Sequence, residues 1–505
     1  MLRRVTTRTK LSQPFPLRRR GSAYTGPVLP RRSRLVPPIA RGELTAALQA
    51  LRAELDLPAA FPLEVEAAAT HAAETVSADT VTSGLADLRG IEFLTIDPEG
   101  STDLDQALHL ERTASGAVLH YAIADVPAYV TPDGPVDAEA RRRGQTLYAP
   151  DGRIPLHPPV VSEDAASLLP DRDRRAYVWR FDLDEGARPR ETTLVRAIVR
   201  SRAQWNYHDA QRAIDAGDAP ASIAALEWFG HQRAERERDR GGASLNLPET
   251  RVVAEGDGYR IEQSEGVPLE DWNAHVSLLT GMAAAEIMVR GRVGILRTMP
   301  PADPAAVAAF RAQTVALGVP WREGVPYGDY LRDLGRGPLE RAVREYAAGL
   351  FRGAGYVAFD GAVPEEITQA AIGAAYAHTT APLRRLVDRW SLVVCEALAN
   401  GREVPAWARD SLEALPDLMA RSSQKASQLA AGALDRVEAA LLQGREGQVF
   451  EGIVLRQSGD GARVQLTDPP VVAKVKDLDA EPGSDVRLRL ASVSIPDGTV
   501  TLVPA

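Results

Sequence analysis

The chain has 505 residues, of which 45% are hydrophobic and 25% are charged, and its formal net charge is −9. This length is enough for about three domains of roughly 150 residues, and the composition is that of an ordinary folded protein. No apolar run reaches the ~18 residues of a membrane-spanning helix, so we expect no membrane span. Cys395 is the only cysteine. It excludes an intrachain disulfide and a thiolate-rich zinc site, and it favours a reducing, cytoplasmic location.

The amino-terminal segment, residues 1–42, is a basic extension with eleven Lys and Arg residues and no Asp or Glu. Its six prolines argue against a regular helix. Three interpretations stay open: an Arg-rich targeting peptide, a flexible arm that touches phosphates, and a solvated tail without a function.

Residues 43–84 are expected to form a small helical module. Four leucines from Leu44 to Leu55 follow the i, i+3/i+4 spacing of one apolar helix face. A second helix is expected after Pro62, through an Ala-rich stretch to Glu74. The pair could form a helix-turn-helix-like module or simply pack on the next domain.

The third region, residues 85–443, mixes strands and helices and is predicted to be α+β. Apolar β-like runs lie at 91–96, 118–123, 177–181 and 193–199, and helical stretches at 275–290, 304–316, 383–399 and 417–442. Five short β runs separated by turn clusters fill the last region, 444–505. That number of strands in so few residues predicts an all-β OB barrel, with a barrel that binds nothing as the alternative.

An acidic cluster directly follows the apolar run 91–96. Asp97 is expected at the strand end, and Asp103 and Asp105 are expected to point to one side of an extended stretch. Converging carboxylates repel each other unless a cation lies between them, and hard oxygen ligands select Mg²⁺, Mn²⁺ or Ca²⁺ rather than zinc. An EF-hand is excluded, because Thr102 and Leu108 stand where that loop needs Gly and Glu. A solvated acidic turn stays an alternative.

A cationic cluster follows much later in the chain. Pro382 suits the first turn of a helix, with Thr380 as its N-cap, so Arg384 and Arg385 are expected in that first turn. Two arginines with free N–H groups would form a phosphate-binding site. An ion pair between Arg384 and Asp388 is the competing interpretation.

Together these segments resemble the ribonuclease II family, whose catalytic part is called the RNB domain. The resemblance covers roughly residues 85–400. It rests on four motifs in order: LADLRGIEFLTIDPEGSTDLDQALHL, HYAIADVPAYV, EARRRGQTLYAPDGRIPLHPPVVSEDAASLLP and HTTAPLRRLVDRW. The carboxy-terminal barrel is similar to the S1-type OB domain of this family.

The resemblance implies a metal-dependent, processive 3′→5′ exoribonuclease. Such an enzyme would hydrolyse single-stranded RNA in an internal channel to nucleoside 5′-monophosphates, with Mg²⁺ or, as a substitute, Mn²⁺. It implies neither a membrane nor an obligate protein partner. A related enzyme acting on another phosphodiester, such as DNA, is a further alternative.

The resemblance also assigns roles to residues of this chain. Asp97, Asp103 and Asp105 would be metal-site carboxylates, with Asp105 the one least tolerant of change. Arg384 would hold the scissile phosphate and stabilise its developing charge. Tyr148 would stack on a base near the 3′ end, or be a core tyrosine instead. Further RNA contacts are expected from His378, Arg385 and Glu323.

Three departures from the family pattern matter. Gln106 stands where the family usually has a second consecutive Asp; its amide oxygen can ligate a hard cation but brings no charge. A weakened, RNA-binding pseudo-enzyme is therefore the alternative function. No second aromatic residue for a base clamp is found in Gly294–Arg297. Residues 1–84 cannot hold two cold-shock OB domains, so the basic arm and the helical module are expected to replace them in part.

Overall fold

The computed structural model describes residues 36–76, 85–243, 249–255, 258–264, 266–335 and 337–505. Most of the basic extension, residues 1–35, lies outside them. Within these ranges, no helix combines the length and apolar character that crossing a membrane requires.

The two amino-terminal helices are α1 (Pro38–Glu54) and α2 (Leu63–Thr75), as the leucine and alanine patterns predict. α1 begins earlier than expected, inside the proline-rich segment, because proline is compatible with the first turn of a helix. The leucine face of α1 is buried with α12 (Leu415–Leu442), whereas α2 is buried against α3 (Pro135–Arg143) and the π-helix η2 (Val160–Ala165). The helices thus belong to separate cores, which favours packing on the larger domain over a helix-turn-helix-like module.

The largest sheet has the strand order β1-β8-β2-β3-β4-β7. Its strands are β1 (Ala86–Asp87), β2 (Phe93–Asp97), β3 (Gln106–Thr113), β4 (Gly116–Ala124), β7 (Asp173–Leu183) and β8 (Pro189–Asn206). The long strand β8 pairs antiparallel with β7 over its first part and parallel with β2 over its last part. The sheet therefore closes on itself, and all four predicted β runs are confirmed as strands.

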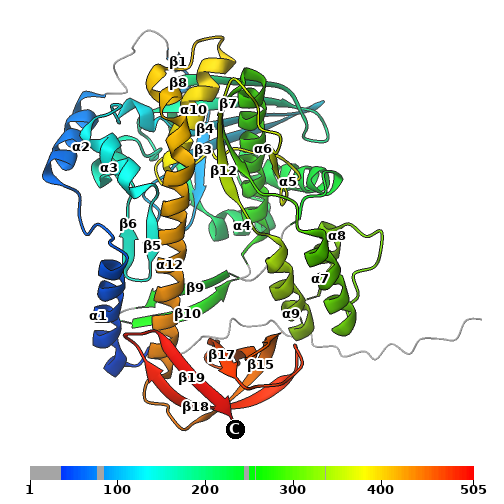
Figure 1. The fold of residues 1–505 in the computed structure, drawn as a ribbon. Coiled ribbons are helices and arrows are strands. Elements are labelled where there is room, and N and C mark those ends of the chain that lie inside the picture. Colours follow the sequence, from blue (N-terminus) through cyan, green and yellow to red (C-terminus); the bar gives the residue numbers. More distant parts are fainter. Residues whose placement is uncertain (1–35, 77–84, 244–248, 256–257, 265, 336) are drawn as a thin grey trace, which may run out of the picture. The chain divides into compact units, whose positions relative to one another are not determined.

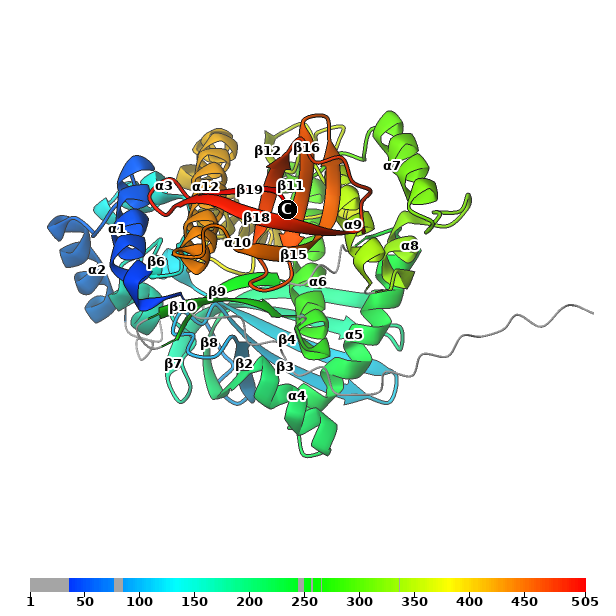
Figure 2. The same ribbon diagram turned by 90° about the horizontal axis from the view of Figure 1, so that it is seen from below.

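Helices cover this sheet and connect it to the rest of the chain (Figures 1 and 2). They are α3 (Pro135–Arg143), α4 (Tyr207–Ala216), α5 (Ala221–Asp239), α6 (Pro268–Gly291), α10 (Leu386–Ala399), α11 (Ala406–Asp410) and α12 (Leu415–Leu442). α10 is buried along almost its whole length, which explains why most of its residues are apolar. The predicted helices at 275–290, 383–399 and 417–442 are confirmed, the second with a later start.

Smaller elements complete the large region. The short strand pairs are β5 (Leu147–Ala149) with β6 (Gly152–Ile154), β9 (Glu249–Glu255) with β10 (Gly258–Ser264), β11 (Val293–Thr298) with β12 (Gly355–Asp360), and β13 (Thr368–Gln369) with β14 (Ala374–Ala375). The helices α7 (Pro304–Ala316), α8 (Tyr327–Asp333) and α9 (Pro338–Ala347) share a core of their own.

The carboxy-terminal residues form a separate five-stranded sheet in the order β17-β16-β15-β18-β19. These strands are β15 (Val449–Ser458), β16 (Gly461–Leu466), β17 (Val472–Lys476), β18 (Asp485–Ser494) and β19 (Thr499–Pro504). The edge strands β17 and β19 also contact each other, so the sheet is barrel-like, as predicted. α12 reaches these strands and contacts β18 and β19 (Figure 1).

Candidate active site

Asp97 is the last residue of β2, as predicted, and it pairs in register with Asn206 at the end of the parallel strand β8. Its Oδ2 atom is buried and has no hydrogen-bond partner within the described residues. Burial raises the pKa of the Asp97 carboxyl to about 7, although the nearby Arg384 charge lowers it; Asp103 raises it further. A buried carboxylate with an unused oxygen is an open position for a cation or a proton.

Asp105 is only 2% exposed and lies directly before β3. Its Oδ1 accepts a hydrogen bond of 2.7 Å from the Leu383 N–H, and its Oδ2 lies 3.4 Å from Arg384 Nε. Burial raises the pKa of Asp105 to about 8, partly offset by Arg384. These contacts join the acidic segment to the cationic segment, which are far apart in the sequence.

Asp103 has a different hydrogen-bond partner from Asp105, although its charge raises the pKa of both Asp97 and Asp105. Arg153 Nη1 donates to Asp103 Oδ1 at 2.6 Å, and Arg153 Nη2 pairs with Glu163 at 2.8 Å. Arg153 lies on β6, within the motif that contains Tyr148, but its charge pairing was not predicted. Among the described residues, no group of three or more Asp, Glu, His or Cys side chains is gathered closely enough to hold a metal ion.

Gln106 connects the acidic segment to the cationic segment a second time. Its Nε2 donates to the main-chain carbonyl of Thr380. Its Oε1 has no hydrogen-bond partner in the described part of the chain. An aspartate at this position would have no N–H to donate, so Gln106 makes a contact that the family's usual residue cannot make.

The segment before α10 differs from the prediction. α10 begins at Leu386, and Arg385 has extended dihedral angles of φ −130° and ψ 125°. The reason is a backbone pairing: Thr146 N–H donates to the Arg384 carbonyl, and Leu386 N–H donates to the Gly144 carbonyl. Arg384 and Arg385 therefore precede the helix, and Thr380 is not its N-cap. In the turn expected to bind phosphate, the N–H groups of Ala381 and Leu383 already donate to the carboxylates of Asp388 and Asp105.

The two arginines have different surroundings. Arg385 donates through Nε and Nη2 to Asp388, at 2.9 and 2.8 Å, and the Asp388 side chain is fully buried. The ion pair of Arg384 with Asp388, which was the alternative interpretation, is thus not formed. Asp388 pairs with Arg385 instead. The Arg384 side chain is 47% exposed, and its terminal nitrogens have no hydrogen-bond partner among the described residues. Arg384 thus pairs with Asp105 through Nε and leaves its terminal nitrogens open, whereas Arg385 is bound to Asp388 through both Nε and Nη2.

Tyr148 lies on β5 and is 54% exposed, so it is not a core tyrosine. Burial raises the pKa of its hydroxyl, as do the nearby charges of Asp103 and Asp105, while Arg384 lowers it. Tyr148 therefore lies beside the acidic and cationic groups and presents an exposed ring there.

His378 lies near the site but is tightly enclosed. Its Nδ1 is 2.7 Å from the Tyr356 hydroxyl, and the Tyr376 ring packs edge-on against it. Burial, followed by the charges of Arg385 and Arg297, holds the pKa of His378 well below its usual range. His378 is therefore neutral and positions these tyrosines.

Glu323 is exposed in the loop between α7 and α8, next to the aromatic core around Trp321. No contact joins Glu323 to the acidic segment within the described ranges. The structure therefore does not bring Glu323 together with the other predicted site residues.

Two tyrosines beside Asp97 were missed by sequence reasoning. Tyr121 shares a hydrogen bond of 2.8 Å with Ser277, and Asn273 donates to the Tyr207 hydroxyl at 3.3 Å. The pKa of each hydroxyl is raised by burial and further by the charge of Asp97. Tyr121 lies in the apolar strand β4, and Tyr207 directly follows β8. Nothing in the local sequence pattern distinguishes either tyrosine from a core residue.

Comparisons with known proteins identify the family. A family model described as "RNB domain" matches residues 85–398, and one described as "RNase II-type exonuclease C-terminal S1 domain" matches residues 448–505. The chain therefore belongs to the RNB family, with an α+β RNB domain followed by an S1-type OB domain.

Individual relatives are more distant. Ribonuclease R of Vibrio cholerae is 25% identical over 441 residues, which is 82% of this chain and 53% of the relative. This chain thus spans about half the length of the curated relatives it matches. The structure of Mycoplasma genitalium RNase R in complex with ribose-methylated single-stranded RNA has a TM-score of 0.81 and 17% identity, covering 92% of this chain and 78% of that one. Yeast Ssd1, described as a pseudonuclease, has a TM-score of 0.66 and 14% identity, covering 89% and 58%. At such low identity, the TM-scores of these two structures show a shared fold and nothing further.

Proposed function

We propose that this chain is a metal-dependent, processive 3′→5′ exoribonuclease that hydrolyses single-stranded RNA to nucleoside 5′-monophosphates. The observation that carries the proposal is the juxtaposition of the partly buried Asp97 and the buried Asp105 with the guanidinium of Arg384, whose terminal nitrogens are unpaired within the described residues. Membership of the RNB family and the RNA-bound fold relative support the choice of substrate.

The donor set fits a hard divalent cation, Mg²⁺ with Mn²⁺ as a substitute. The buried Asp97 Oδ2 lacks a hydrogen-bond partner among the described residues, and carboxylate oxygens are the preferred ligands of both ions. Asp97, Asp103 and Asp105 would hold the metal, with the amide oxygen of Gln106 as a neutral fourth ligand, once these side chains are drawn closer together than they lie in this structure, where Arg153 holds Asp103. When bound, the metal supplies activation of the attacking water and neutralisation of phosphate charge.

The chain's own groups act on the phosphate and the base. Arg384, held in place by Asp105, presents its terminal N–H groups to solvent and would donate to the scissile phosphate. Tyr148 would stack on a base near the 3′ end, a contact that every base can make. Arg385 and His378 would act through the positions of their neighbours.

The alternative is a catalytically weakened RNA-binding protein of the same fold. Two observations favour it: Gln106 brings no charge to the acidic cluster, and the shared fold includes a pseudonuclease. In this case RNA would be held by Tyr148 and Arg384 without hydrolysis.

Incubation of the intact protein with 3′-labelled and 5′-labelled single-stranded RNA and Mg²⁺ separates the two functions. We expect mononucleotides from the 3′-labelled RNA at the earliest times, and a label that stays on long fragments in the 5′-labelled RNA. Asp105→Asn serves as the control for contaminating nucleases. RNA binding without mononucleotide release would support the alternative.

We infer a basic arm (1–42), a helical module (43–84), the RNB domain (85–443) and the S1-type domain (444–505), in a cytoplasmic protein without an obligate partner. The arm and the module would guide RNA in place of cold-shock domains.

A further inference from the structure

Arg153 lies on β6 and places a positive charge on one of the carboxylates that are proposed to hold the metal. Its Nη1 donates to Asp103 Oδ1 at 2.6 Å, and its Nη2 donates to Thr102 Oγ1 at 2.7 Å. The same Nη2 pairs with Glu163 Oε1 at 2.8 Å, and the Thr102 hydroxyl donates to Glu163 Oε2 at 3.1 Å. The Arg153 guanidinium thus joins the acidic segment to Glu163.

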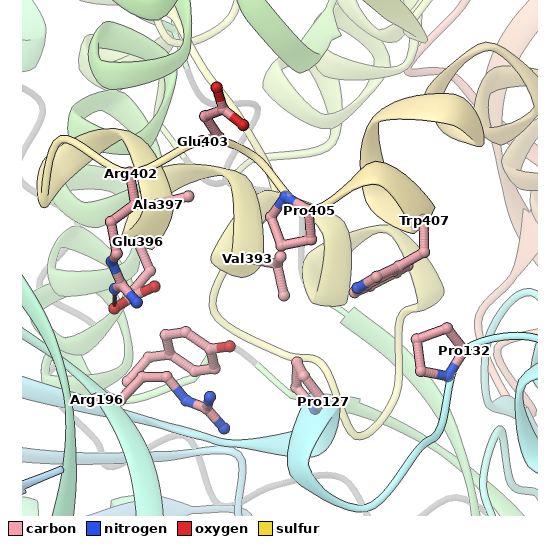
Figure 3. A pocket seen from close by; sticks show the side chains of 11 residues that line it. Pro127, Pro132, Arg196, Val393, Glu396, Ala397, Arg402, Glu403, Pro405 and Trp407 are labelled. Carbon is pink, nitrogen blue, oxygen red and sulfur yellow. Dashed lines mark hydrogen bonds and ion pairs between the residues drawn. The ribbon is translucent and has the colours of Figure 1, made fainter. Parts of the chain in front are cut away.

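Another arginine–carboxylate pair of the chain shows what is special about this contact. Arg402 and Glu396 pair on the wall of a cavity of about 250 Å³ beside α10 (Figure 3). None of the described residues that line this cavity belongs to the acidic or the cationic segment. The pair of Arg402 with Glu396 can therefore persist whether or not a metal is bound, whereas Arg153 contacts a carboxylate that the metal would use.

A guanidinium and a divalent cation are alternatives at Asp103. The guanidinium neutralises part of the carboxylate charge and repels a second cation placed beside it. The Arg153 and Asp103 side chains are 28% and 14% exposed, and a pair that is partly open to water contributes little to stability. A guanidinium that left Asp103 could keep Glu163, so its charge would not lose every partner.

The β5–β6 hairpin is held in place by contacts outside the acidic segment. Leu147 and Ile154 anchor it in the core shared with α1 and α12. At the turn of the hairpin, Asp151 accepts a hydrogen bond of 2.7 Å from Arg52 of α1. The Arg153 side chain can therefore change its partner while the backbone of the hairpin stays in place.

We propose that Arg153 is a positioning residue that competes with the divalent cation for Asp103. When the cation binds, the guanidinium leaves Asp103 and keeps Glu163. It stays on the same face of the hairpin as Tyr148, its cross-strand partner. Metal binding is thereby coupled to the charge beside the ring that is proposed to stack on a base. The inference rests on the metal site of the proposed function.

Titration of the full chain with Mn²⁺, without RNA, tests the competition, with the free ion measured by electron paramagnetic resonance. Asp97→Asn identifies the site, because tight binding should be lost in this variant. Arg153→Gln should bind Mn²⁺ about fivefold more tightly than the wild type, because nothing else occupies Asp103. Arg52→Gln is the matched control, since its side chain is also 28% exposed and contacts the same hairpin without touching Asp103. Its Mn²⁺ affinity should equal that of the wild type, and thermal melts check that the variants fold.

A double-mutant cycle separates the competition for Asp103 from the general effect of removing a positive charge. In an Asp103→Asn background, Arg153→Gln should change the Mn²⁺ affinity by less than about twofold, because the contested carboxylate is gone. The full gain in that background would overturn the inference. So would unchanged or weaker Mn²⁺ binding in Arg153→Gln alone, tight binding that survives Asp97→Asn, or no binding in the wild type and Arg153→Gln alike.

The RNA assay keeps this inference distinct from the proposed function. If the wild type hydrolyses RNA and Arg153→Gln binds Mn²⁺ no more tightly than it, the inference alone fails. If the Mn²⁺ affinities change as expected but no mononucleotide is released, the proposed hydrolysis alone fails.

Discussion

Gln106 donates its side-chain amide to the main-chain carbonyl of Thr380, a residue 274 positions later in the chain. This bond joins the start of β3, where the carboxylates end, to the turn that carries Arg384. An uncharged side chain at an acidic position of the family pattern thus has a structural role that a carboxylate could not fill.

Gln106→Asp tests the two roles of this residue at once. The added negative charge beside Asp105 should lower the Mg²⁺ concentration needed for half-maximal activity. The loss of the donor should leave the Thr380 carbonyl unpaired and lower the free energy of unfolding by about 1–3 kcal/mol. Activity titrated against Mg²⁺ and urea unfolding measure the two effects.

Gln106→Ala is the control, because it removes the bond without adding charge. It should reproduce the loss of stability and leave the Mg²⁺ requirement unchanged or higher. An identical Mg²⁺ requirement in the Asp variant and the wild type would contradict a role of position 106 in metal binding.

Replacement of Arg384 should mainly lower activity, whereas replacement of the adjacent Arg385 should mainly lower stability. Arg385→Ala leaves the fully buried Asp388 carboxylate with the Ala381 N–H but without its cationic partner, so we expect the protein to lose about 3–5 kcal/mol of stability. Arg384→Ala removes a half-exposed side chain, and should lower kcat by about 10²–10³-fold with a small effect on stability.

Thermal melts and single-turnover hydrolysis, measured on both variants, separate these effects. Arg384→Lys is a useful third variant, since it keeps the charge and loses the guanidinium fork. Full activity in Arg384→Ala would remove Arg384 from the proposed mechanism.

Regular patterns in the sequence predicted most of the fold. The apolar runs around Ile96 and Val195 became strands, and the last five β runs became the S1-type sheet, because the spacing of apolar residues reports local burial directly. Asp97 at a strand end followed from the same pattern. The predicted start of α10 was wrong because the backbone of Arg384 and Leu386 pairs with the backbone of Gly144 and Thr146. This contact joins distant segments, and no local sequence pattern contains it.

The sequence also could not predict which side chains of the site pair with one another. Asp103 and Asp105 are close in sequence, yet one pairs with Arg153 and the other with Leu383 and Arg384. Only the closed sheet and the β5–β6 hairpin bring these partners together. Pairing between oppositely charged side chains is decided by such tertiary proximity, so carboxylate spacing alone could not assign it.

The basic extension gives a prediction about RNA affinity. Residues 1–35 contain ten Lys and Arg residues, and each that contacts a phosphate contributes about −0.7 to the slope of log K against log salt for a single strand. Removal of residues 1–35 should therefore weaken RNA binding at low salt and flatten this slope. The truncation stops before α1, whose leucine face is buried with α12.

Fluorescence anisotropy with single-stranded RNA over a range of salt concentrations gives the slope. Replacement of the ten basic residues by Gln and Ser in the full-length chain is the matched control, and should behave like the truncation. An unchanged slope in both proteins would show that the extension does not touch RNA phosphates.

Glu438 on α12 gives a prediction about pH. Its side chain is buried, and its Oε1 accepts a hydrogen bond of 3.0 Å from the Val472 N–H of β17. Burial raises the pKa of Glu438 from an ordinary value of 4.5 to about 8, the Val472 bond lowers it, and the charge of Asp435 raises it. Arg463 is the cation that faces it and lowers its pKa. The carboxyl is therefore protonated in the folded chain at neutral pH.

Between these two pKa values the folded state holds a proton that the unfolded state has lost. The stability that Glu438 contributes is thus fully present below about pH 4.5, falls as the pH rises, and levels off above about pH 8.

Glu438→Gln keeps the acceptor for Val472 and has no charge to bury. Its stability should match the wild type near pH 4.5 and exceed it by a few kcal/mol above about pH 8. Urea unfolding across this pH range measures the difference, and Glu446→Gln, an exposed residue, should give a curve parallel to the wild type. Parallel curves for Glu438→Gln as well would mean that Glu438 is ionised in the folded chain.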